Sequence, residues 1–478
     1  GIEGESLASA LLANGVTVMG RSFKYHRPRG PLGAGAEEPN ALFGVDRGKG
    51  RVTPDCRATQ IEVYEGLVAT SQNRWPSLGF DVGVVNEAFS PLMPSGFYYK
   101  TFMGPGKAWE KIYEPIIRNA AGLGTPPKDA DPDRYQQFYA HCDVLIAGAG
   151  PAGLAAALVA GASGARVILA DERDALGGSL LWETGARLDG HSAAAWLDRV
   201  RAQLAALPNV RVLTRTQVFG WYPANRLGLE ERVTDHLAAP AADLPRARMW
   251  QVRAREVVIA TGAIERPLLF HGNDRPGVML ADAARVYLNR WGVALGKNVL
   301  VATSDDQAYR AALDLKAGGS AIAAIVDYRP APSGAWVEAA KAAGIRVIAN
   351  AQIVSTKGRA VVASATLSTG ETLNCDALLM SGGWTPAVHL FSQSRGKLRY
   401  DEASGAYLPG ESFANERSAG GCRGVYGLAA CLADGAKAGA DAAAKAGFPA
   451  PAAPAPTVAG DHETSGVPAD RFQPATPK

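Results

Sequence analysis

The chain has 478 residues, of which 47% are hydrophobic and 20% are charged, so it is long enough for about three domains with large buried cores. Its 49 basic and 46 acidic residues leave a net charge of +3, which gives no electrostatic reason to expect nucleic acid or an anionic membrane as the main partner. Five cysteines without a paired framework favour a reducing, cytoplasmic location.

The first region, residues 1–105, contains RSFKYHRPRGPLGAGAEEPNALF (21–43), which resembles the ferredoxin-like domain at the start of some amine-oxidising subunits. In cluster-binding relatives, cysteines follow the R-P-R-G motif closely, because thiolates must hold the 2Fe–2S cluster. The matching loop, residues 31–40, has no cysteine, and Cys56 stands alone. We therefore expect a ferredoxin-like β-grasp domain without a cluster, followed by a Pro-rich, helix-poor connector over residues 106–138.

Residues 141–172, HCDVLIAGAGPAGLAAALVAGASGARVILADE, have the pattern of a strand, a glycine-rich turn, a helix and a second strand. Gly148, Gly150 and Gly153 permit a tight turn, close approach of a pyrophosphate and close helix packing, respectively. The helix N-terminus favours phosphate binding. Asp171 and Glu172 end the second strand, where a carboxylate accepts hydrogen bonds from a ribose diol and disfavours the 2′-phosphate of NADP. The charge-free stretch 144–165 could cross a bilayer, but its glycine spacing fits a nucleotide-binding unit better.

Further motifs resemble flavoprotein reductases with two dinucleotide-binding domains. These are the strand ending in Ala260-Thr261-Gly262 and the turn Leu176-Gly177-Gly178. The resemblance implies an α/β fold with a first dinucleotide-binding domain at 139–275 and 373–447 and a second Rossmann-like domain inserted at 276–372. The candidate nucleotide-binding residues are Gly148, Ala149, Gly150, Pro151, Ala152, Gly153, Asp171, Glu172, Arg173, Gly178, Thr261 and Gly262.

Two further turns narrow the choice of nucleotide. The corresponding turn of the second domain, residues 302–306, has no glycine and has two carboxylates, so we do not expect an ordinary NAD(P)H site there. Related flavoproteins bind the flavin ribityl chain with a Gly-Asp pair near the end of the fold, and the stretch 424–431 lacks one. The chain also has no C-x-x-C motif for disulfide chemistry. These absences favour NAD over FAD.

The sequence as a whole is similar to the α subunit of heterotetrameric, tetrahydrofolate-linked sarcosine oxidase, through RSFKYHRPRG, RATQIEVYEGLVATSQNRWPSLGFDVG, GFYYKTFMGPGKAWEKIYEPIIRNAAGLG and VFGWYPANRLGL. The resemblance implies β, γ and δ partner subunits, FAD in β, FMN at the α–β interface and NAD in this chain. It also implies that residues 448–478 are a Pro/Ala-rich linker to a folate-binding domain that is missing here. Sarcosine would be demethylated to glycine, with H2O2 and formaldehyde or 5,10-methylenetetrahydrofolate as the other products.

Five basic residues and one threonine could donate hydrogen bonds or charge to FMN, or could simply hold the first domain in place. They are Lys24, His26, Arg27, Arg29, Lys100 and Thr101. We assign no catalytic residue and no metal ligand to this chain, and we expect neither nucleic acid nor membrane as a partner. Two alternatives stay open. One is a self-sufficient FAD-dependent NADH oxidoreductase. The other is a nucleotide-binding subunit, holding ATP for example, of a related amine or proline dehydrogenase complex.

Overall fold

The computed structural model describes residues 1–2, 4–92, 96, 104–122, 124–449, 455–462, 464 and 466–475. Its N-terminal part begins with helix α1 (Leu7–Ala13), which is capped by the Ser6 side chain. Two short antiparallel ladders follow, β1–β2 and β4–β3–β5. Their strands are β1 (Gly20–Arg21), β2 (Pro28–Arg29), β3 (Leu42–Asp46), β4 (Val52–Arg57) and β5 (Val68–Ser71).

The segment after this part contains more helix than expected. Short helical turns η1 (Val82–Val84), α2 (Val85–Ala88) and η2 (Ser90–Leu92) come first. In the predicted helix-poor connector, η3 (Trp109–Tyr113) runs into α4 (Glu114–Ala121). Pro115 stands in the first turn of α4, where a missing N–H costs nothing, so this proline does not prevent a helix. The connector also ends early, because β6 already begins at Tyr135.

The first large sheet has the strand order β10-β7-β6-β13-β12-β11, with β26 also paired to β13. Strands β10, β7, β6, β13 and β26 run parallel, while β12 and β11 form an antiparallel extension. Their bounds are β6 (Tyr135–Ala147), β7 (Val167–Ala170), β10 (Val210–Leu213), β11 (Thr216–Tyr222), β12 (Arg226–Arg232), β13 (Ala247–Ile259) and β26 (Glu416–Ser418).

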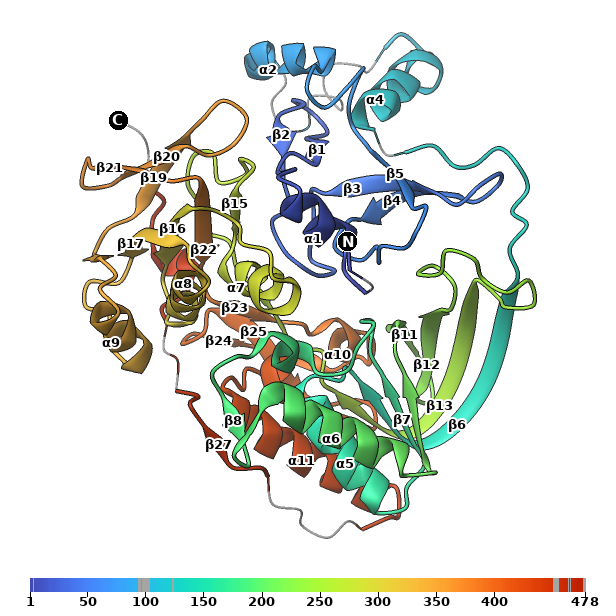
Figure 1. The fold of residues 1–478 in the computed structure, drawn as a ribbon. Helices are drawn as coiled ribbons and strands as arrows, with labels where there is room; N and C mark the ends of the chain where they lie inside the picture. Colours follow the sequence, from blue (N-terminus) through green and yellow to red (C-terminus); the bar gives the residue numbers. More distant parts are fainter. Residues whose placement is uncertain are drawn as a thin grey trace.

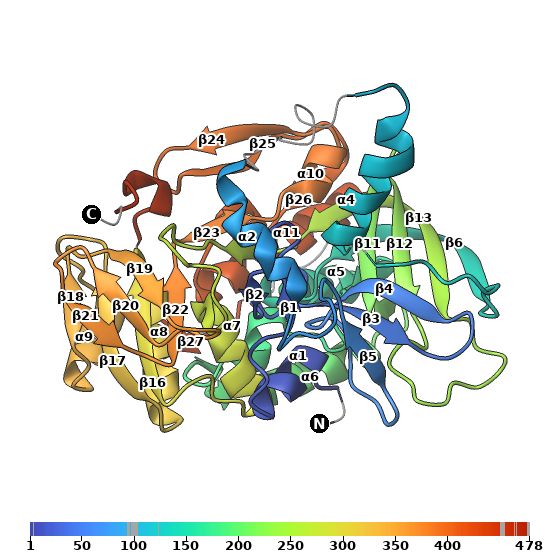
Figure 2. The same ribbon diagram turned by 90° about the horizontal axis from the view of Figure 1, so that it is seen from above.

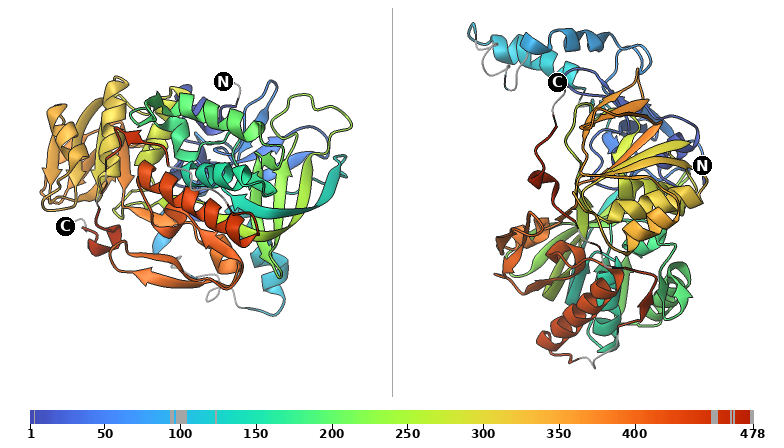
Figure 3. Two further views of the ribbon diagram at one scale, coloured as in Figure 1. Left: turned by 90° about the horizontal axis from the view of Figure 1, so that it is seen from below. Right: turned by 90° about the vertical axis from the view of Figure 1, so that its left-hand side faces the viewer.

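Three helices lie together beside this sheet in Figure 1: α5 (Pro151–Ala162), α6 (Ala193–Ala205) and α11 (Leu428–Lys445). Helix α11 runs alongside α5 (Figure 3, left), and glycines allow the close approach. A Cβ at Gly435 would lie 2.0 Å from the carbonyl oxygen of Ala152, and one at Gly439 would lie 2.4 Å from that of Ala156. This contact fixes the position of α11 relative to the glycine-rich turn that starts α5.

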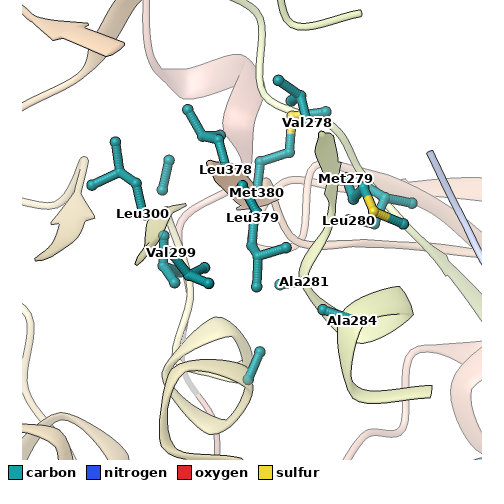
Figure 4. Packing of buried hydrophobic residues seen from close by; sticks show 14 of the residues in the cluster. Val278, Met279, Leu280, Ala281, Ala284, Val299, Leu300, Leu378, Leu379 and Met380 are labelled. Carbon is teal, nitrogen blue, oxygen red and sulfur yellow. The ribbon is translucent and has the colours of Figure 1, made fainter. Parts of the chain in front are cut away.

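The second large sheet is wholly parallel, with the order β15-β22-β16-β17-β18. Figure 4 shows its core, where aliphatic side chains of β15, β16 and β22 meet those of α7. Strand β22 lies beyond the boundary expected at residue 372, because it completes the parallel sheet between β15 and β16. The bounds are β15 (Val278–Leu280), α7 (Ala281–Arg285), η5 (Val286–Arg290), β16 (Asn298–Thr303), α8 (Gln307–Ala317), β17 (Ala321–Asp327), α9 (Ala335–Ala342), β18 (Val347–Ala349) and β22 (Ala377–Ser381).

Smaller elements complete the fold. They are η4 (Gly178–Trp182), β8 (Arg187–Leu188), β9 (His191–Ser192), β14 (Ala263–Glu265), β19 (Ile353–Lys357), β20 (Ser364–Leu367), β21 (Thr372–Asn374), β23 (Trp384–Pro386), α10 (His389–Gln393), β24 (Lys397–Asp401), β25 (Ala406–Glu411), η6 (Gly420–Arg423), β27 (Val458–Ala459) and η7 (Ala469–Arg471). Strand β27 pairs with β8, so the predicted linker is partly packed onto the body of the molecule. Among the described residues, no helix combines the length and apolar character needed to span a membrane.

Candidate nucleotide-binding site

The glycine-rich turn after β6 is held together by its own packing. Gly148 has a φ of 100°, and a Cβ on it would lie 2.3 Å from the carbonyl oxygen of Ala260. A Cβ on Gly153 would lie 1.9 Å from the carbonyl oxygen of Gly148. Gly150 differs, because its φ is −72° and the nearest atom to an added Cβ is the Cα of Gly178, 3.9 Å away. The first and third glycines are therefore required by the fold, whereas the second lies at an open surface.

That open surface belongs to a cavity of about 760 Å³. The cavity brings together most of the residues expected at the site, and those on its wall are Gly148, Gly150, Pro151, Ala152, Asp171, Glu172, Arg173, Gly178, Thr261 and Gly262. Ala149 is fully buried, and neither it nor Gly153 is part of the lining. Helix α5 begins at the wall, so its N-terminal N–H groups are offered where a phosphate would be favoured.

The two candidate carboxylates have different environments. Asp171 is buried, and its side chain accepts hydrogen bonds from the backbone N–H groups of Ala149 (2.6 Å) and Arg173 (2.9 Å). Burial raises the pKa of Asp171, and these two hydrogen bonds oppose the rise. Glu172 is half-buried, and its carboxylate makes no hydrogen bond to the described residues. Burial also raises the pKa of Glu172, while the charge of Arg173 lowers it. Asp171 thus organises the turn, and Glu172 has its acceptors available for a ligand.

Sequence reasoning missed much of the cavity wall. The loop 34–37 of the N-terminal part closes one side, next to Glu172. Figure 2 shows these N-terminal elements lying between the two large sheets. The repeated small residues of GPLGAGAEE were the available signal for such close approach. Elsewhere the wall comes from β14, α7, α8, β23 and the loop before α11, through residues Glu265, Arg285, Arg310, Trp384 and Tyr426.

The N-terminus of α11 meets a carboxylate at this cavity. The backbone N–H of Leu428 donates a hydrogen bond to Asp461 Oδ2 at 2.6 Å, and Arg310 lies 4.0 Å from Asp461 Oδ1. The C-terminal segment therefore supplies a carboxylate to the N-terminus of this helix. Nearby, burial raises the pKa of Cys422, and burial raises that of Cys431 to about 12. These shifts favour the protonated thiol at both positions; Cys422 is buried and Cys431 is half-buried.

The corresponding turn of the second sheet is covered by the same C-terminal segment, which runs from β27 towards this sheet in Figure 1. The Val467 N–H donates a hydrogen bond to the carbonyl oxygen of Ser304 at 2.8 Å. A Cβ added to Gly466 would lie 2.6 Å from the Cβ of Asp305. The Ser381 hydroxyl donates to Asp305 at 2.7 Å, and Arg329 lies 2.8 Å from Asp306. Both carboxylates of this turn are buried and paired with other side chains. The expectation that no ordinary NAD(P)H site lies here stays a prediction.

The basic residues considered for FMN have partners within the chain. His26 is buried with Nδ1 2.9 Å from Asp81 Oδ2, and Arg27 donates to Glu87 at 2.8 Å. Arg29 pairs with Asp274 at 2.5 Å, and the Lys24 ammonium lies 5.0 Å from the Tyr25 ring centroid. These contacts hold the N-terminal part together and join it to Asp274, in the 139–275 stretch of the first dinucleotide-binding domain. Lys100 and Thr101 lie outside the described residues.

Two family models match this chain. Residues 1–74 match the 2Fe-2S iron-sulfur cluster binding domain, and residues 142–446 match the pyridine nucleotide-disulphide oxidoreductase model. The first match shows that the expectation of a cluster-free ferredoxin-like domain is wrong, since the domain falls in a cluster-binding class. The expectation rested on the absence of cysteine from residues 31–40 and on Cys56 as the single cysteine of residues 1–74. One thiolate does not supply the ligands that a 2Fe–2S cluster needs.

Known proteins resemble the chain over nearly its whole length. Sarcosine oxidase subunit alpha of Rhizobium meliloti (strain 1021) is 51% identical over 94% of this chain and 45% of its own length. The corresponding subunit of Corynebacterium sp. (strain P-1) is 40% identical over 93% of this chain and 42% of its own. This chain thus spans less than half of these relatives, and they confirm the resemblance seen in the sequence. L-Proline dehydrogenase from P. horikoshii shares the fold, with a TM-score of 0.64, 21% identity and coverage of 94% of this chain and 72% of that one.

Proposed function

Because the chain belongs to the pyridine nucleotide-disulphide oxidoreductase family and is related to sarcosine oxidase α subunits, we propose that it is the NAD-binding part of such a subunit. The observation that carries the proposal is the cavity wall. It combines the Gly148–Gly153 turn, the N-terminus of α5 and a carboxylate at Glu172 with acceptors available. This is the arrangement that holds a pyrophosphate and an unphosphorylated ribose.

In this proposal the residues of the chain bind and orient the nucleotide. Backbone N–H groups at the start of α5 hold the pyrophosphate, and Gly150 and Gly178 leave room for it. Glu172 accepts hydrogen bonds from a ribose diol, while Asp171 keeps the turn in shape. NAD can accept a hydride when bound, but the protonated thiols of Cys422 and Cys431 offer no redox partner beside it. The nucleotide therefore has a structural role.

The chemistry of the whole complex lies outside these residues. We propose that sarcosine is demethylated to glycine, with H2O2 and formaldehyde or 5,10-methylenetetrahydrofolate as the other products, at flavins of a complex with β, γ and δ subunits. FAD belongs to β, FMN to the α–β interface, and tetrahydrofolate to a domain outside this chain. The α chain contributes its side of the α–β interface and a bound NAD.

The alternative of a self-sufficient flavin enzyme receives less support from the site. A carboxylate, Asp461, already accepts the hydrogen bond from the Leu428 N–H at the N-terminus of α11. The second nucleotide turn is covered by residues 466–467. A chain that reduces its own flavin with NADH would need both positions for ligands.

Co-expression with candidate β, γ and δ subunits tests the proposal. We expect a purified complex that consumes oxygen when sarcosine is added and retains one NAD per α chain, with no change in the redox state of that NAD during turnover. Oxygen consumption with NADH, but not with sarcosine, would contradict the proposal. So would a complex that is active without any bound nucleotide and gains nothing when NAD is supplied.

A further inference from the structure

Three residues that line the cavity each carry a buried side-chain polar atom that has no hydrogen-bond partner among the described residues. These atoms are Glu265 Oε1, Trp384 Nε1 and the Tyr426 hydroxyl oxygen. Buried polar groups in folded proteins are nearly always paired, so each such atom needs an explanation. Three residues of this kind on the lining of a single cavity point to a polar ligand at this part of the wall.

The fold brings these residues together from distant parts of the sequence. Glu265 on β14 and Trp384 on β23 are directly opposite each other in an antiparallel pair. Arg266 donates to the carbonyl oxygen of Trp384 at 2.8 Å, and its charge acts on the Tyr426 phenol. Turn η6, which precedes the loop that contains Tyr426, lies against the start of β14, because a Cβ on Gly421 would lie 3.3 Å from the carbonyl carbon of Gly262 and 3.4 Å from the backbone nitrogen of Ala263. The three residues therefore frame one region of the wall, next to the Thr261–Gly262 corner.

The donor and acceptor capacity of this region defines its ligand. The Trp384 indole can only donate, and the Tyr426 hydroxyl can donate and accept. Glu265 Oε2 accepts from the Asp282 N–H at 2.9 Å. Burial first, and the charge of Asp282 second, raise the pKa of Glu265 well above its ordinary value, which favours the protonated carboxyl. A protonated carboxyl can donate as well as accept. Uncharged donors and acceptors suit an amide better than a phosphate or a carboxylate.

We propose that Glu265, Trp384 and Tyr426 form the subsite that binds the carboxamide of the nicotinamide ring, so that the cavity selects NAD over nucleotides that end in a phosphate or a ribose. The inference rests on the proposed NAD binding and names the residues that give it specificity. A primary carboxamide has one acceptor oxygen and two donor N–H groups, which complements a Trp donor, a Tyr hydroxyl and a neutral carboxyl. The turn at Gly148–Gly153 holds the shared ADP-ribose portion.

Titration with NAD and with ADP-ribose, which lacks the nicotinamide, tests the subsite. For the purified chain freed of nucleotide, we expect NAD to bind at least about tenfold more tightly than ADP-ribose, the effect of two to three neutral hydrogen bonds. Tyr426→Phe and Trp384→Phe should each reduce this ratio by about three- to tenfold and leave the ADP-ribose affinity within about twofold. Tyr407→Phe, at an exposed tyrosine, is the matched control and should leave the ratio unchanged.

Substitutions of Glu265 separate hydrogen bonding from packing. Glu265→Gln keeps a neutral acceptor and donor, so we expect it to retain the preference for NAD. Glu265→Leu removes both, so the preference should fall towards one. Equal binding of NAD and ADP-ribose by the unsubstituted chain would overturn the subsite and leave the proposed turn site standing. Failure of both ligands to bind would overturn the subsite together with the proposed function.

Discussion

Replacing Gly150 with valine is expected to weaken NAD binding strongly while leaving the fold intact. The residue has an ordinary φ of −72°, so a side chain causes no backbone strain. The nearest atom to an added Cβ is 3.9 Å away, in Gly178, so the β-carbon itself fits without a clash. The branched methyl groups would nevertheless project into the cavity, where the pyrophosphate is proposed to lie.

The magnitude follows from the hydrogen bonds that a displaced pyrophosphate loses. A hydrogen bond to a charged group contributes about 1.5–3 kcal/mol, so the loss of two costs at least about 3 kcal/mol. This corresponds to a reduction in NAD affinity of at least about a hundredfold. Gly153→Ala provides the contrast. Its Cβ would lie 1.9 Å from a carbonyl oxygen, so it should destabilise the fold by about 1–3 kcal/mol.

Isothermal titration with NAD and thermal unfolding of the nucleotide-free proteins separate these effects. Gly79→Val is the control, because an added Cβ there meets no atom within 4 Å and Gly79 does not line the cavity. It should bind NAD normally. If Gly150→Val bound NAD as tightly as the unsubstituted chain, the pyrophosphate would not lie at this turn and the reasoning would be refuted.

Three further predictions concern the supporting structure. Asp461→Ala removes the side-chain cap of α11 and should cost about 1 kcal/mol of stability in urea unfolding, whereas Asp461→Asn should cost less. Arg166 lowers the pKa of Asp143 by hydrogen bonding, so its stabilisation is present above the unfolded pKa of about 3.9 and is lost as the pH falls through the lower folded value. Arg166→Met should therefore destabilise the chain by about 1 kcal/mol or less at neutral pH and not at all in strong acid, measured as unfolding free energy against pH. Gly466→Val should detach the C-terminal segment and expose the Val467 amide to hydrogen exchange, while Gln473→Ala should not; unchanged exchange in the valine variant would contradict the packing described.

The sequence was sufficient to predict those parts of the site that depend on contacts between residues close together in the chain. The spacing of Gly148 and Gly153 predicts the turn, because each glycine is required by an atom of the same turn or of the adjoining Ala260. The choice between Asp171 and Glu172 could not be made in advance. It depends on which carboxylate accepts hydrogen bonds from the backbone N–H groups of the folded turn, and the geometry of the loop decides this.

The remainder of the site depends on long-range pairing. Glu265 and Trp384 become neighbours only through the register of β14 and β23, and Asp461 reaches α11 from a segment whose composition is typical of a linker. No local pattern predicts such contacts. The error about the N-terminal domain has a different origin, since the number of cysteines describes potential cluster ligands and does not by itself define the class of the domain.

The most direct test of NAD binding is to purify this chain alone, denature it and identify the released small molecules by absorbance and mass spectrometry. The account predicts NAD in about equal amount to the protein, with no flavin. Stoichiometric FAD, together with NADH oxidation by the chain alone, would contradict it and make the chain a self-sufficient flavoenzyme.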